Sequence, residues 1–412
     1  MTGLDLDFVR SNFPAFCEPS LAGQHFVENA GGSYACKQTI DLLEGYYRKT
    51  KVQPYLPHGA GIAAGKAMDR AEARWAEALG VARGEINFGP STSANSYVLS
   101  QAFRRLLTPG DEIIVTNQDH EANTGAMRRM AEENGFPLRE WQVDPQSGQL
   151  HVSGLEALLN DRTAVVCMPH CSNLIGQENP VAAWTALAKQ APQNPAVIVD
   201  GVSRAPHSIP DVAEIGCDVY LFSLYKVYSV HQGMMVVRKA LNEKLPNQGH
   251  FFNAGYPTKR LTPAGPDHAQ IAASAGVLDY MEALDRHHGG AGNGDLAQAV
   301  QRVNGLWKDH EDRLLAPLLD YLRGRNSLRI LGQDHVGGRH PTVALQTDRD
   351  PEAIATALGS KGIMAGFGDF YAYRLVKALG LDPQRGVVRL SLVHYNSPED
   401  VDATCKALDE IL

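Results

Sequence analysis

Between about residues 85 and 240, short apolar runs alternate with stretches whose apolar positions recur at helical spacing. The runs have the length of strands and read DEIIVT, TAVVCMPH, PAVIVD, DVYLFS and GMMVVR. Helices are expected over 93–107, 121–135 and 181–191, and the first opens at a Ser/Thr cluster that can cap it. Strands that are apolar along their whole length are typical of a parallel sheet covered on both faces.

The pattern changes after a helical stretch near 268–285. The segment HHGGAGNGD at 287–295 is rich in glycine, which suits a loop or a domain junction. A long helix is expected near 295–325, then strands at RILG, TVALQT and VVRLSLV, and a last helix from Pro398 onward. The class is therefore α/β, and its expected parts are an N-terminal arm at 1–24, a large domain at 25–285 and a smaller α+β domain at 286–412.

Composition narrows the possible partners. The chain has 412 residues, and Asp and Glu outnumber Lys and Arg by 46 to 38, with no long basic run, so neither nucleic acid nor an anionic membrane is an expected partner. The start, MTGLDLDFVRSNFPAF, lacks a secretory signal, which predicts a cytoplasmic location. The six cysteines form no CxxC pair, so we expect no metal site and interpret them as small buried residues.

Polar residues follow the predicted strands where each one ends. His120 follows DEIIVT, Asn173 follows TAVVCMPH, Asp200 ends PAVIVD, and Lys226 follows DVYLFS. Ligands of parallel α/β sheets bind outside the carboxyl ends of the strands. These four side chains are therefore expected to converge on one site.

Lys226 and Asp200 indicate the chemistry of that site. A lysine just past an apolar strand can be buried enough to act as an amine nucleophile, although a surface lysine in a loop is the commoner case. Asp200 changes that balance, because a buried carboxylate needs a partner and a protonated pyridine nitrogen provides one. A purely structural hydrogen bond is the alternative for Asp200.

A phosphate site is expected in the segment INFGPSTSANS. Ser91 and Thr92 stand at a helix start, where free backbone N–H groups and the helix dipole favour a phosphate. His120 can lie against a ring face, and Asn173 can bond a phenolic oxygen. Each of these residues alone is more often structural, but together with Lys226 and Asp200 they supply what pyridoxal 5'-phosphate requires.

With these residues in place, the chain resembles class V of the fold-type-I pyridoxal-phosphate enzymes, the group that contains cysteine desulfurases. FVENAGGS resembles the family's N-terminal strand and loop, DHEAN its ring-stacking histidine motif, and HCSNLIGQENPV its SN-x-x-G motif. The segment VDGVSRAPHSIPDVAEIGCDVYLFSLYKVYSVHQG resembles its Asp-to-Lys core. The resemblance covers nearly the whole chain and implies a mainly parallel, seven-stranded sheet in the large domain.

The resemblance also implies residue roles. It assigns the Schiff base to Lys226. The catalytic residues that it implies are Lys226, His120 and Asp200. Its other implied contacts are Ser91, Thr92 and Ser223 at the phosphate, Asn173 at the phenolic oxygen, Ser203 and Tyr225 beside the cofactor, and Arg389, Asn29 and Ala30 at the substrate α-carboxylate.

Departures from the desulfurase pattern bear on the reaction. Desulfurases carry a nucleophilic cysteine before the last strand, but KGIMAGFGDFYAYRLVKALGL has none, and Cys405 lies in the final helix. We therefore expect a branch that lacks the catalytic cysteine, and favour β-elimination or carbon–sulfur lyase chemistry on a small L-amino acid without a protein persulfide. The candidates for contacts with the leaving group or side chain are Tyr225, His231, Arg204, Tyr371 and Tyr373.

Other functions stay open. Removal of the α-proton by Lys226 is common to elimination, racemisation and transamination, so a class V aminotransferase that uses a 2-oxo acid is the main alternative. A non-catalytic binding subunit is a remote one. A metal hydrolase built on His120 and Glu121, or on His287 and His288, is weaker because neither pair has an HExxH-type spacing.

The resemblance further implies a homodimer whose sites are completed by both subunits. The candidates for the segments that cross between subunits are Tyr55, His58 and 250–268.

Overall fold

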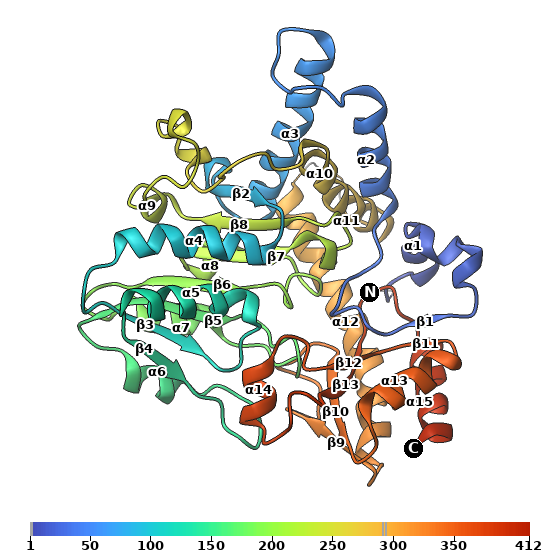
Figure 1. Ribbon diagram of the computed structural model, residues 1–412. Helices are drawn as coiled ribbons and strands as arrows, with labels where there is room; N and C mark the ends of the chain where they lie inside the picture. The colour runs from blue at the N-terminus through green and yellow to red at the C-terminus, as the bar shows by residue number, and fades with distance from the viewer. Residues whose placement is uncertain (1–2, 291, 293–294) are drawn as a thin grey trace.

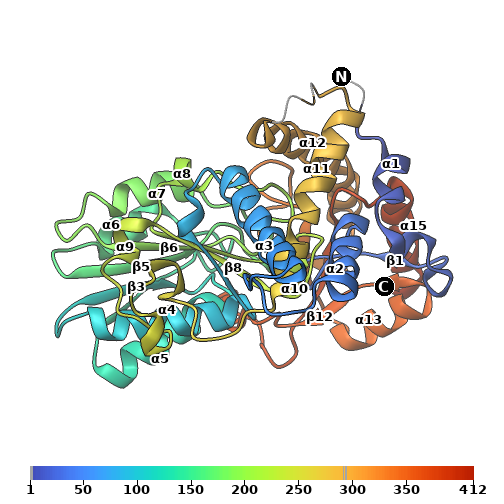
Figure 2. The same ribbon diagram turned by 90° about the horizontal axis from the view of Figure 1, so that it is seen from above.

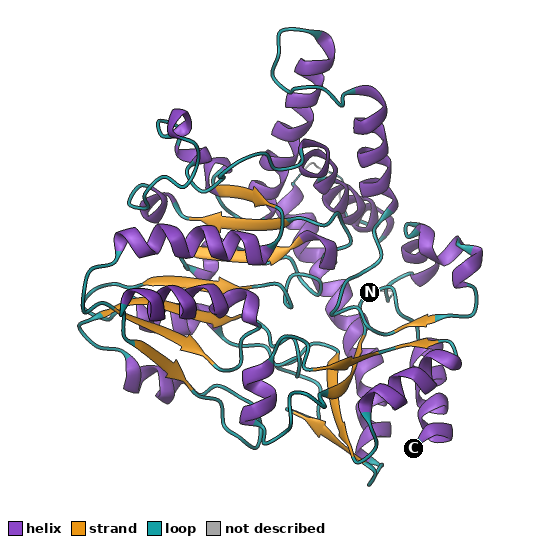
Figure 3. Ribbon diagram, in the orientation of Figure 1, coloured by secondary structure: helices purple, strands orange, loops and turns teal. Residues whose placement is uncertain are grey.

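The structure is a computed structural model, and it describes residues 3–290, 292 and 295–412 (Figure 1). A seven-stranded sheet lies in the larger part of the molecule and a four-stranded sheet in the smaller part, as Figures 1 and 3 show. Figure 2 shows the two parts side by side, with the long helix α12 on the side of the smaller one. The predicted α/β class, with a large, mainly parallel sheet, is confirmed.

The large sheet contains all five strands expected from the apolar runs. In spatial order its strands are β2 (Ile86–Gly89), β8 (Gly233–Val237), β7 (Val219–Ser223), β6 (Ala196–Asp200), β5 (Thr163–Pro169), β3 (Glu112–Thr116) and β4 (Leu138–Trp141). Strand β8 runs antiparallel to both neighbours, and the other pairs are parallel. A short loop joins β7 to β8, and such a connection can only return the chain in the antiparallel direction.

Helices cover both faces of this sheet. On one face, Leu99 and Phe103 of α4 and Met127 of α5 belong to the cluster that packs on Ile113 and Val165. The other face carries Trp75 and Trp184. The helices of the large part are α2 (Lys37–Lys49), α3 (Gly59–Ala78), α4 (Thr92–Leu106), α5 (Glu121–Asn134), α6 (Val152–Leu158), α7 (Val181–Ala188), α8 (Val212–Ile215), α9 (Lys239–Asn242), α10 (His268–Ser274) and α11 (Gly276–His287).

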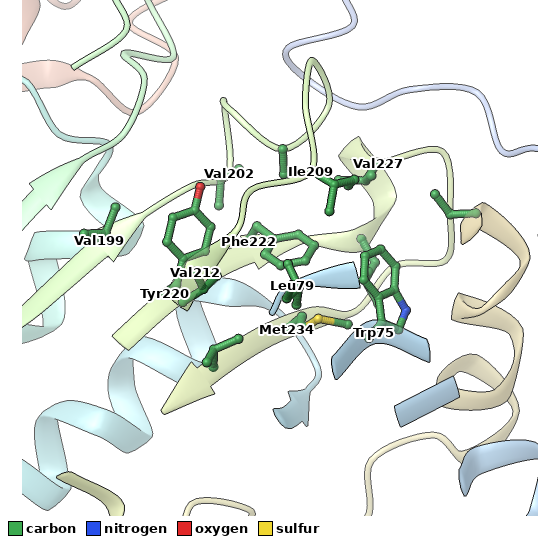
Figure 4. Close-up of a cluster of buried hydrophobic side chains, with 14 of the residues drawn as sticks. Trp75, Leu79, Val199, Val202, Ile209, Val212, Tyr220, Phe222, Val227 and Met234 are labelled. Carbon is green, nitrogen blue, oxygen red and sulfur yellow. The ribbon is translucent and has the colours of Figure 1, made fainter. Parts of the chain in front are cut away.

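Figure 4 shows part of the core on the second face, where Trp75 of α3 lies beside Phe222 of β7 and Met234 of β8. The indole Nε1 of Trp75 donates a hydrogen bond to Ser274 Oγ at 3.0 Å, so its polar atom is satisfied although the side chain is fully buried. Burial of a side chain of this kind contributes about 2–3 kcal/mol. This packing fixes β7, whose carboxyl end leads into the site.

The stretch expected as one helix near 268–285 is two helices, α10 and α11. They are separated at Ala275, and a Cβ on Gly276 would lie 2.3 Å from the backbone nitrogen of Thr39 in α2. The absence of a side chain at Gly276 therefore lets α11 approach α2 closely. Of the glycine-rich loop expected at 287–295, residues 291, 293 and 294 lie outside the described residues.

The smaller part contains the strands and helices that the C-terminal pattern predicts. Its sheet has the order β12 (Gly366–Gly368), β13 (Val387–Ser391), β10 (Thr342–Thr347) and β9 (Leu328–Leu331), and all pairs are antiparallel. Its helices are α12 (Leu296–Arg323), α13 (Pro351–Ser360), α14 (Tyr373–Ala378) and α15 (Pro398–Ile411).

The N-terminal segment contacts both parts. Arg10, in α1 (Leu6–Ser11), pairs with Asp400 of α15 at 2.8 Å, and Asp5 pairs with His287 of α11 at 2.8 Å. Strand β1 (His25–Phe26), expected in the large domain, pairs in parallel with β11 (Ile363–Met364) of the C-terminal segment. The predicted domain limits, after residues 24 and 285, stay a prediction. Strand β1 begins directly after the first of these limits.

No helix among the described residues is both long and apolar enough to cross a membrane. The cytoplasmic location stays a prediction.

Candidate active site

A pocket of about 750 Å³ opens at the carboxyl ends of β5, β6 and β7, between the starts of α4 and α5. All nine residues expected at the cofactor line it: Ser91, Thr92, His120, Asn173, Asp200, Ser203, Ser223, Tyr225 and Lys226. Residues up to 135 positions apart are thus brought together because parallel strands place their carboxyl ends at one edge of the sheet.

Lys226 lies in a short 3₁₀ helix, Leu224–Lys226, directly after β7, and is 6% exposed. Burial lowers the pKa of its amine to about 8, and the positive charge of Arg389 acts in the same direction, while Asp200 and Glu28 oppose it. A larger fraction of the amine is therefore unprotonated near neutral pH than for an exposed lysine. This is the condition for attack on an aldehyde.

Asp200 ends β6 and is buried. Burial raises the pKa of its carboxyl to about 6, although a hydrogen bond from the Val202 backbone N–H to Oδ1, at 2.8 Å, and the charge of Lys226 lower it. A buried carboxylate with this incomplete set of partners is stabilised by a protonated ring nitrogen. Asp200 thus fits the partner expected for a pyridine nitrogen.

His120 caps the start of α5, and the Ala122 backbone N–H donates to its Nδ1 at 2.9 Å. Burial lowers the pKa of its imidazole to about 3, with the charges of Lys226 and Arg389 adding to the effect. The ring is therefore neutral at physiological pH. A neutral, flat side chain in this position fits the platform expected against the face of the cofactor ring.

The start of α4 forms a cup of hydroxyl and backbone groups. Thr92 Oγ1 and Ser223 Oγ lie 2.8 Å apart, and Ser91 accepts a hydrogen bond from the Ala94 N–H at the helix start. A Cβ on Gly233 of β8 would lie 2.3 Å from the Ser91 carbonyl carbon. Only glycine at this position therefore allows the backbone at Ser91 to pack against β8. Two hydroxyls and a helix N-terminus together suit a phosphate.

Asn173 and Tyr225 flank the same pocket. The Asn173 side-chain Nδ2 donates to the Phe370 carbonyl at 2.8 Å, while its Oδ1 is buried without a partner among the described residues. Tyr225 stacks on His231 with ring centroids 4.8 Å apart and planes 8° apart. Burial raises the pKa of the Tyr225 phenol, so it is a proton donor and not a base.

The three residues expected at the substrate carboxylate lie outside the lining of this pocket. Asn29 and Ala30 border a small neighbouring cavity together with Lys226 and Ser203. The Asn29 amide is already used, since its Nδ2 donates to the Ser391 carbonyl at 2.9 Å and its Oδ1 accepts from the Tyr395 hydroxyl.

Arg389, on β13, is 2% exposed and donates from Nη1 to the Asn173 carbonyl at 2.9 Å. It therefore reaches the polypeptide that forms the pocket wall, from the smaller part of the molecule. Its remaining contacts involve residues for which no role was expected, Glu28 and Phe370.

Of the five candidates for contacts with the substrate side chain, three line the pocket: Tyr225, His231 and Tyr371. Arg204 and Tyr373 do not. The Arg204 Nε instead pairs with Glu178 Oε1 at 2.8 Å. This places Arg204 in a partly buried ion pair and not in the lining of the pocket.

A segment of the smaller part closes the pocket, and sequence reasoning named its Tyr371 but missed Phe370 and Arg374. Phe370 and Tyr371 both have positive φ, 52° and 58°, which is strained for residues with a Cβ. The Tyr371 carbonyl accepts from the Glu121 N–H at 2.9 Å, and Arg374 pairs with the Glu121 carboxylate at 3.1 Å. The aromatic pair in GDFYAY is the only local sign of this segment, and periodicity does not reveal it.

Cysteine chemistry is restricted in this pocket. Cys171 is the one cysteine among its described lining residues, and it is 4% exposed. Its thiol donates to the Gly176 carbonyl, and burial raises the pKa of this thiol far above its ordinary value. Cys405 is half-buried on α15, and burial raises the pKa of its thiol to about 11. Neither group is a ready thiolate nucleophile.

One cluster of described residues has metal-ligand atoms close together, within 4.8 Å: His207, Glu311 and His340. The two imidazole rings are stacked, with centroids 4.6 Å apart and planes 5° apart. Ligand lone pairs lie in the ring plane, so two stacked rings do not point at one ion. The pair His287–His288 considered from the sequence is engaged elsewhere, since His287 binds Asp5.

Comparison with known proteins agrees with this geometry. A model of the family described as aminotransferase class-V matches residues 25–404. An aminotransferase-like protein, FGM3, from Gibberella zeae is 31% identical over 100% of this chain and 99% of its own. A cysteine desulfurase from Serratia proteamaculans is 27% identical over 98% of each chain.

Among solved structures, the apo cysteine desulfurase from Thermococcus onnurineus NA1 superposes with a TM-score of 0.86 at 20% identity, covering 100% of this chain and 98% of its own. The cysteine desulfurase CsdA from Escherichia coli gives 0.82 at 22% identity, covering 99% and 98%. The chain belongs to the class V aminotransferase family and is a pyridoxal-phosphate-dependent enzyme.

Proposed function

We propose that this enzyme binds pyridoxal 5'-phosphate covalently at Lys226 and acts on a small L-amino acid. The observation that carries the proposal is the buried Lys226 amine, with its lowered pKa, in one pocket with Asp200 and a phosphate-sized cup. Burial of a lysine without a partner destabilises the folded protein. A buried lysine in a pocket is therefore better explained by a functional role.

Each residue of the pocket has a role in this proposal. Asp200 holds the ring nitrogen in its protonated form, His120 covers one ring face, and Asn173 bonds the phenolic oxygen. The phosphate binds at Thr92 with its neighbours Ser91 and Ser223. When bound, the cofactor withdraws electrons from the substrate α-carbon.

Different residues accept and donate protons in this proposal. Lys226, once displaced by the substrate amine, takes the α-proton with Nζ. Tyr225, whose phenol stays protonated, and Tyr371 face the region where the substrate side chain lies, and either can give a proton to a departing group. Ser203 lines the same wall and contributes a hydroxyl.

For the outcome we favour β-elimination, or carbon–sulfur lyase chemistry without a protein persulfide. Relatives named cysteine desulfurase support carbon–sulfur chemistry. The burial and raised pKa of Cys171 support a route that uses no protein thiol. A branch of the family that lacks the catalytic cysteine is part of this proposal.

Transamination to a 2-oxo acid is the second candidate, and the relative named aminotransferase-like protein supports it. In that case Lys226 would again carry the proton, and the cofactor would supply the site that keeps the amino group. A non-catalytic binding subunit is the remote alternative, and the intact Lys226 and Asp200 speak against it.

The decisive experiment follows the visible absorption of the purified protein with a panel of L-amino acids, together with assays for oxo acid and ammonium. A lyase accumulates oxo acid and ammonium while its spectrum returns unaided. An aminotransferase stays in the amine form of the cofactor until an oxo acid is added. The K226A variant is expected to lose the lysine-linked band and at least about 1,000-fold of the rate, and a variant with wild-type spectrum would refute the proposal.

We also propose a homodimer. The segment 250–268 exposes large side chains, with Phe251 89% and Phe252 63% exposed, and Tyr55, in the neighbouring loop between α2 and α3, is 58% exposed. Aromatic side chains exposed to this extent are typical of a surface that another chain covers. Light scattering tests this, and a fully active monomer would contradict it.

A further inference from the structure

Arg389 is held on three sides by residues from three separate segments. Its Nε lies 3.3 Å from Glu28 Oε2, and its Nη2 pairs with Glu28 Oε1. Its Nη1 donates to the Asn173 carbonyl, and its Cζ lies 3.7 Å from the centre of the Phe370 ring. One carboxylate, one carbonyl and one aromatic face therefore fix the guanidinium in a single orientation.

The position of Glu28 is itself built into the fold. It lies two residues after β1 and forms a parallel bridge with Ser391 at the end of β13. A Cβ on Gly31 would lie 2.9 Å from Glu28 Oε1, and a Cβ on Gly366 would lie 2.7 Å from its Cδ. Glycine at both positions leaves the space that the carboxylate fills. Gly366 is also the partner of Arg389 in the β12–β13 register.

The hydrogen bonds leave a defined part of Arg389 unused. A guanidinium has five N–H groups, and Glu28 takes those of the Nε edge while the Asn173 carbonyl takes one from Nη1. Among the described residues, one N–H on each terminal nitrogen is left without an acceptor. Terminal N–H groups of a guanidinium are the donors that bind a carboxylate in bidentate fashion.

We propose that Glu28 is a positioning residue, which holds Arg389 so that this remaining edge receives the α-carboxylate of the substrate. The inference rests on the proposed function, because it assumes that amino acids enter the pocket beside Lys226. It adds to that function that recognition of the substrate α-carboxylate depends on the carboxylate of Glu28.

Glu28 also acts on Lys226 through its charge. Arg389 lowers the pKa of the Lys226 amine, and Glu28 raises it. The pair Glu28–Arg389 is thus closer to neutral than a free arginine would be, so the substrate carboxylate is held by directed hydrogen bonds more than by net charge. A permanent Glu28 contact is favoured over a removable one because, among the described residues, the atoms nearest to a Cβ on Gly31 or on Gly366 all belong to Glu28.

The opposite role is a defined alternative. If Glu28 occupied the place of the substrate carboxylate, substrates would have to displace it, and its removal would strengthen their binding. The two roles therefore predict effects of opposite sign when the charge is removed. The isosteric variant E28Q removes the charge with little change of shape.

The test compares L-alanine with ethylamine, which differ only in the α-carboxylate. Each is titrated into the cofactor-loaded protein, and its apparent Kd is taken from the change in the visible spectrum. The ratio of the two constants measures how strongly the α-carboxylate is recognised. We expect E28Q to reduce the preference for L-alanine about tenfold, with the Kd of ethylamine changed less than about twofold.

Two further variants make the result specific. E28D keeps the charge and is expected to retain more of the preference than E28Q. E282Q removes another partly exposed carboxylate, which pairs with Arg74 at 2.8 Å outside the pocket, and is expected to leave the preference unchanged.

The outcomes separate the two proposals. An unchanged preference in E28Q, or a stronger one, overturns the positioning role of Glu28. A wild-type protein that shows no lysine-linked band and no spectral response to L-alanine overturns the proposed function instead. Equal losses for L-alanine and ethylamine in E28Q would mean a general disturbance of the pocket, which also contradicts the inference.

Discussion

Replacement of Asp200 by asparagine is expected to have opposite effects on the cofactor-free and the cofactor-loaded protein. Asparagine has nearly the same shape, and its side-chain oxygen can still accept the hydrogen bond from the Val202 N–H. It removes the negative charge at the end of β6. The effect therefore depends on whether a positive partner for that charge is present.

The magnitude for the cofactor-free protein comes from the pKa of Asp200. Burial raises this pKa from its ordinary value of 3.8 to about 6 in the folded protein. Because the folded pKa is raised, the folded state loses stability relative to the unfolded chain as pH increases from about 4 to about 6, and the loss is complete above that range. A pKa difference of about two between the folded and unfolded states corresponds to roughly 3 kcal/mol of lost folding stability. D200N avoids this loss because asparagine does not ionise.

Without cofactor, D200N should therefore unfold at a higher temperature than the wild type at pH 8, and the two should converge at pH 4. With cofactor bound, the order is expected to reverse, since removal of one member of a buried charge pair costs about 3–5 kcal/mol. The same change should slow exchange of the α-proton of L-alanine at least about 100-fold.

Thermal unfolding at both pH values, with and without cofactor, and proton exchange in D₂O followed by NMR test these statements. The matched control is D119N, because burial also raises the pKa of Asp119, to about 7, while its carboxylate bonds Thr116 and Asn123. D119N should stabilise the cofactor-free protein at pH 8 without the large decrease in the exchange rate of the L-alanine α-proton. A cofactor-free D200N that is less stable than the wild type at pH 8 would refute the reasoning.

Two further predictions concern Lys226 and Cys171. The pKa of the Lys226 amine is lowered to about 8, so capture of added cofactor by the cofactor-free protein should speed up as pH rises and level off above about 8. A rate, followed by the visible band, that still rises near 10.5 would contradict the effect of burial. C171A should keep sulfur release from L-cysteine, if present, within about threefold, because this thiol is buried and protonated. Mass spectrometry should find no persulfide on the wild-type chain, and a persulfide on Cys171 would overturn the cysteine-free route.

Much of the large sheet and of the pocket lining could be predicted because both depend on local sequence. A strand that is apolar along its length, such as AVIVD, indicates burial on both faces, and its last residue must then lie at the carboxyl edge. The strand LREW, β4, was not predicted because only Trp141 of its four residues is buried at this sheet edge. The division of 268–285 was also missed, since a single glycine inside a helical pattern is usually tolerated and only the structure shows that Gly276 lies against α2.

The substrate side of the site was decided by tertiary structure. Glu28 and Arg389 are 361 positions apart, and nothing in either local pattern indicates that they form a pair. The Asn29 side chain, expected at the carboxylate, is instead bonded within the smaller part of the molecule.

The sequence by itself determined the fold class and the family, and it predicted Lys226 as the lysine of the proposed chemistry. These inferences were possible because a buried strand and the polar residue at its end lie within one short segment. Only the tertiary structure decided which groups surround that lysine and in what orientation. Hydrogen bonds such as that from Asn173 to the Phe370 carbonyl join segments about 200 positions apart, and their geometry depends on how the two parts of the molecule pack.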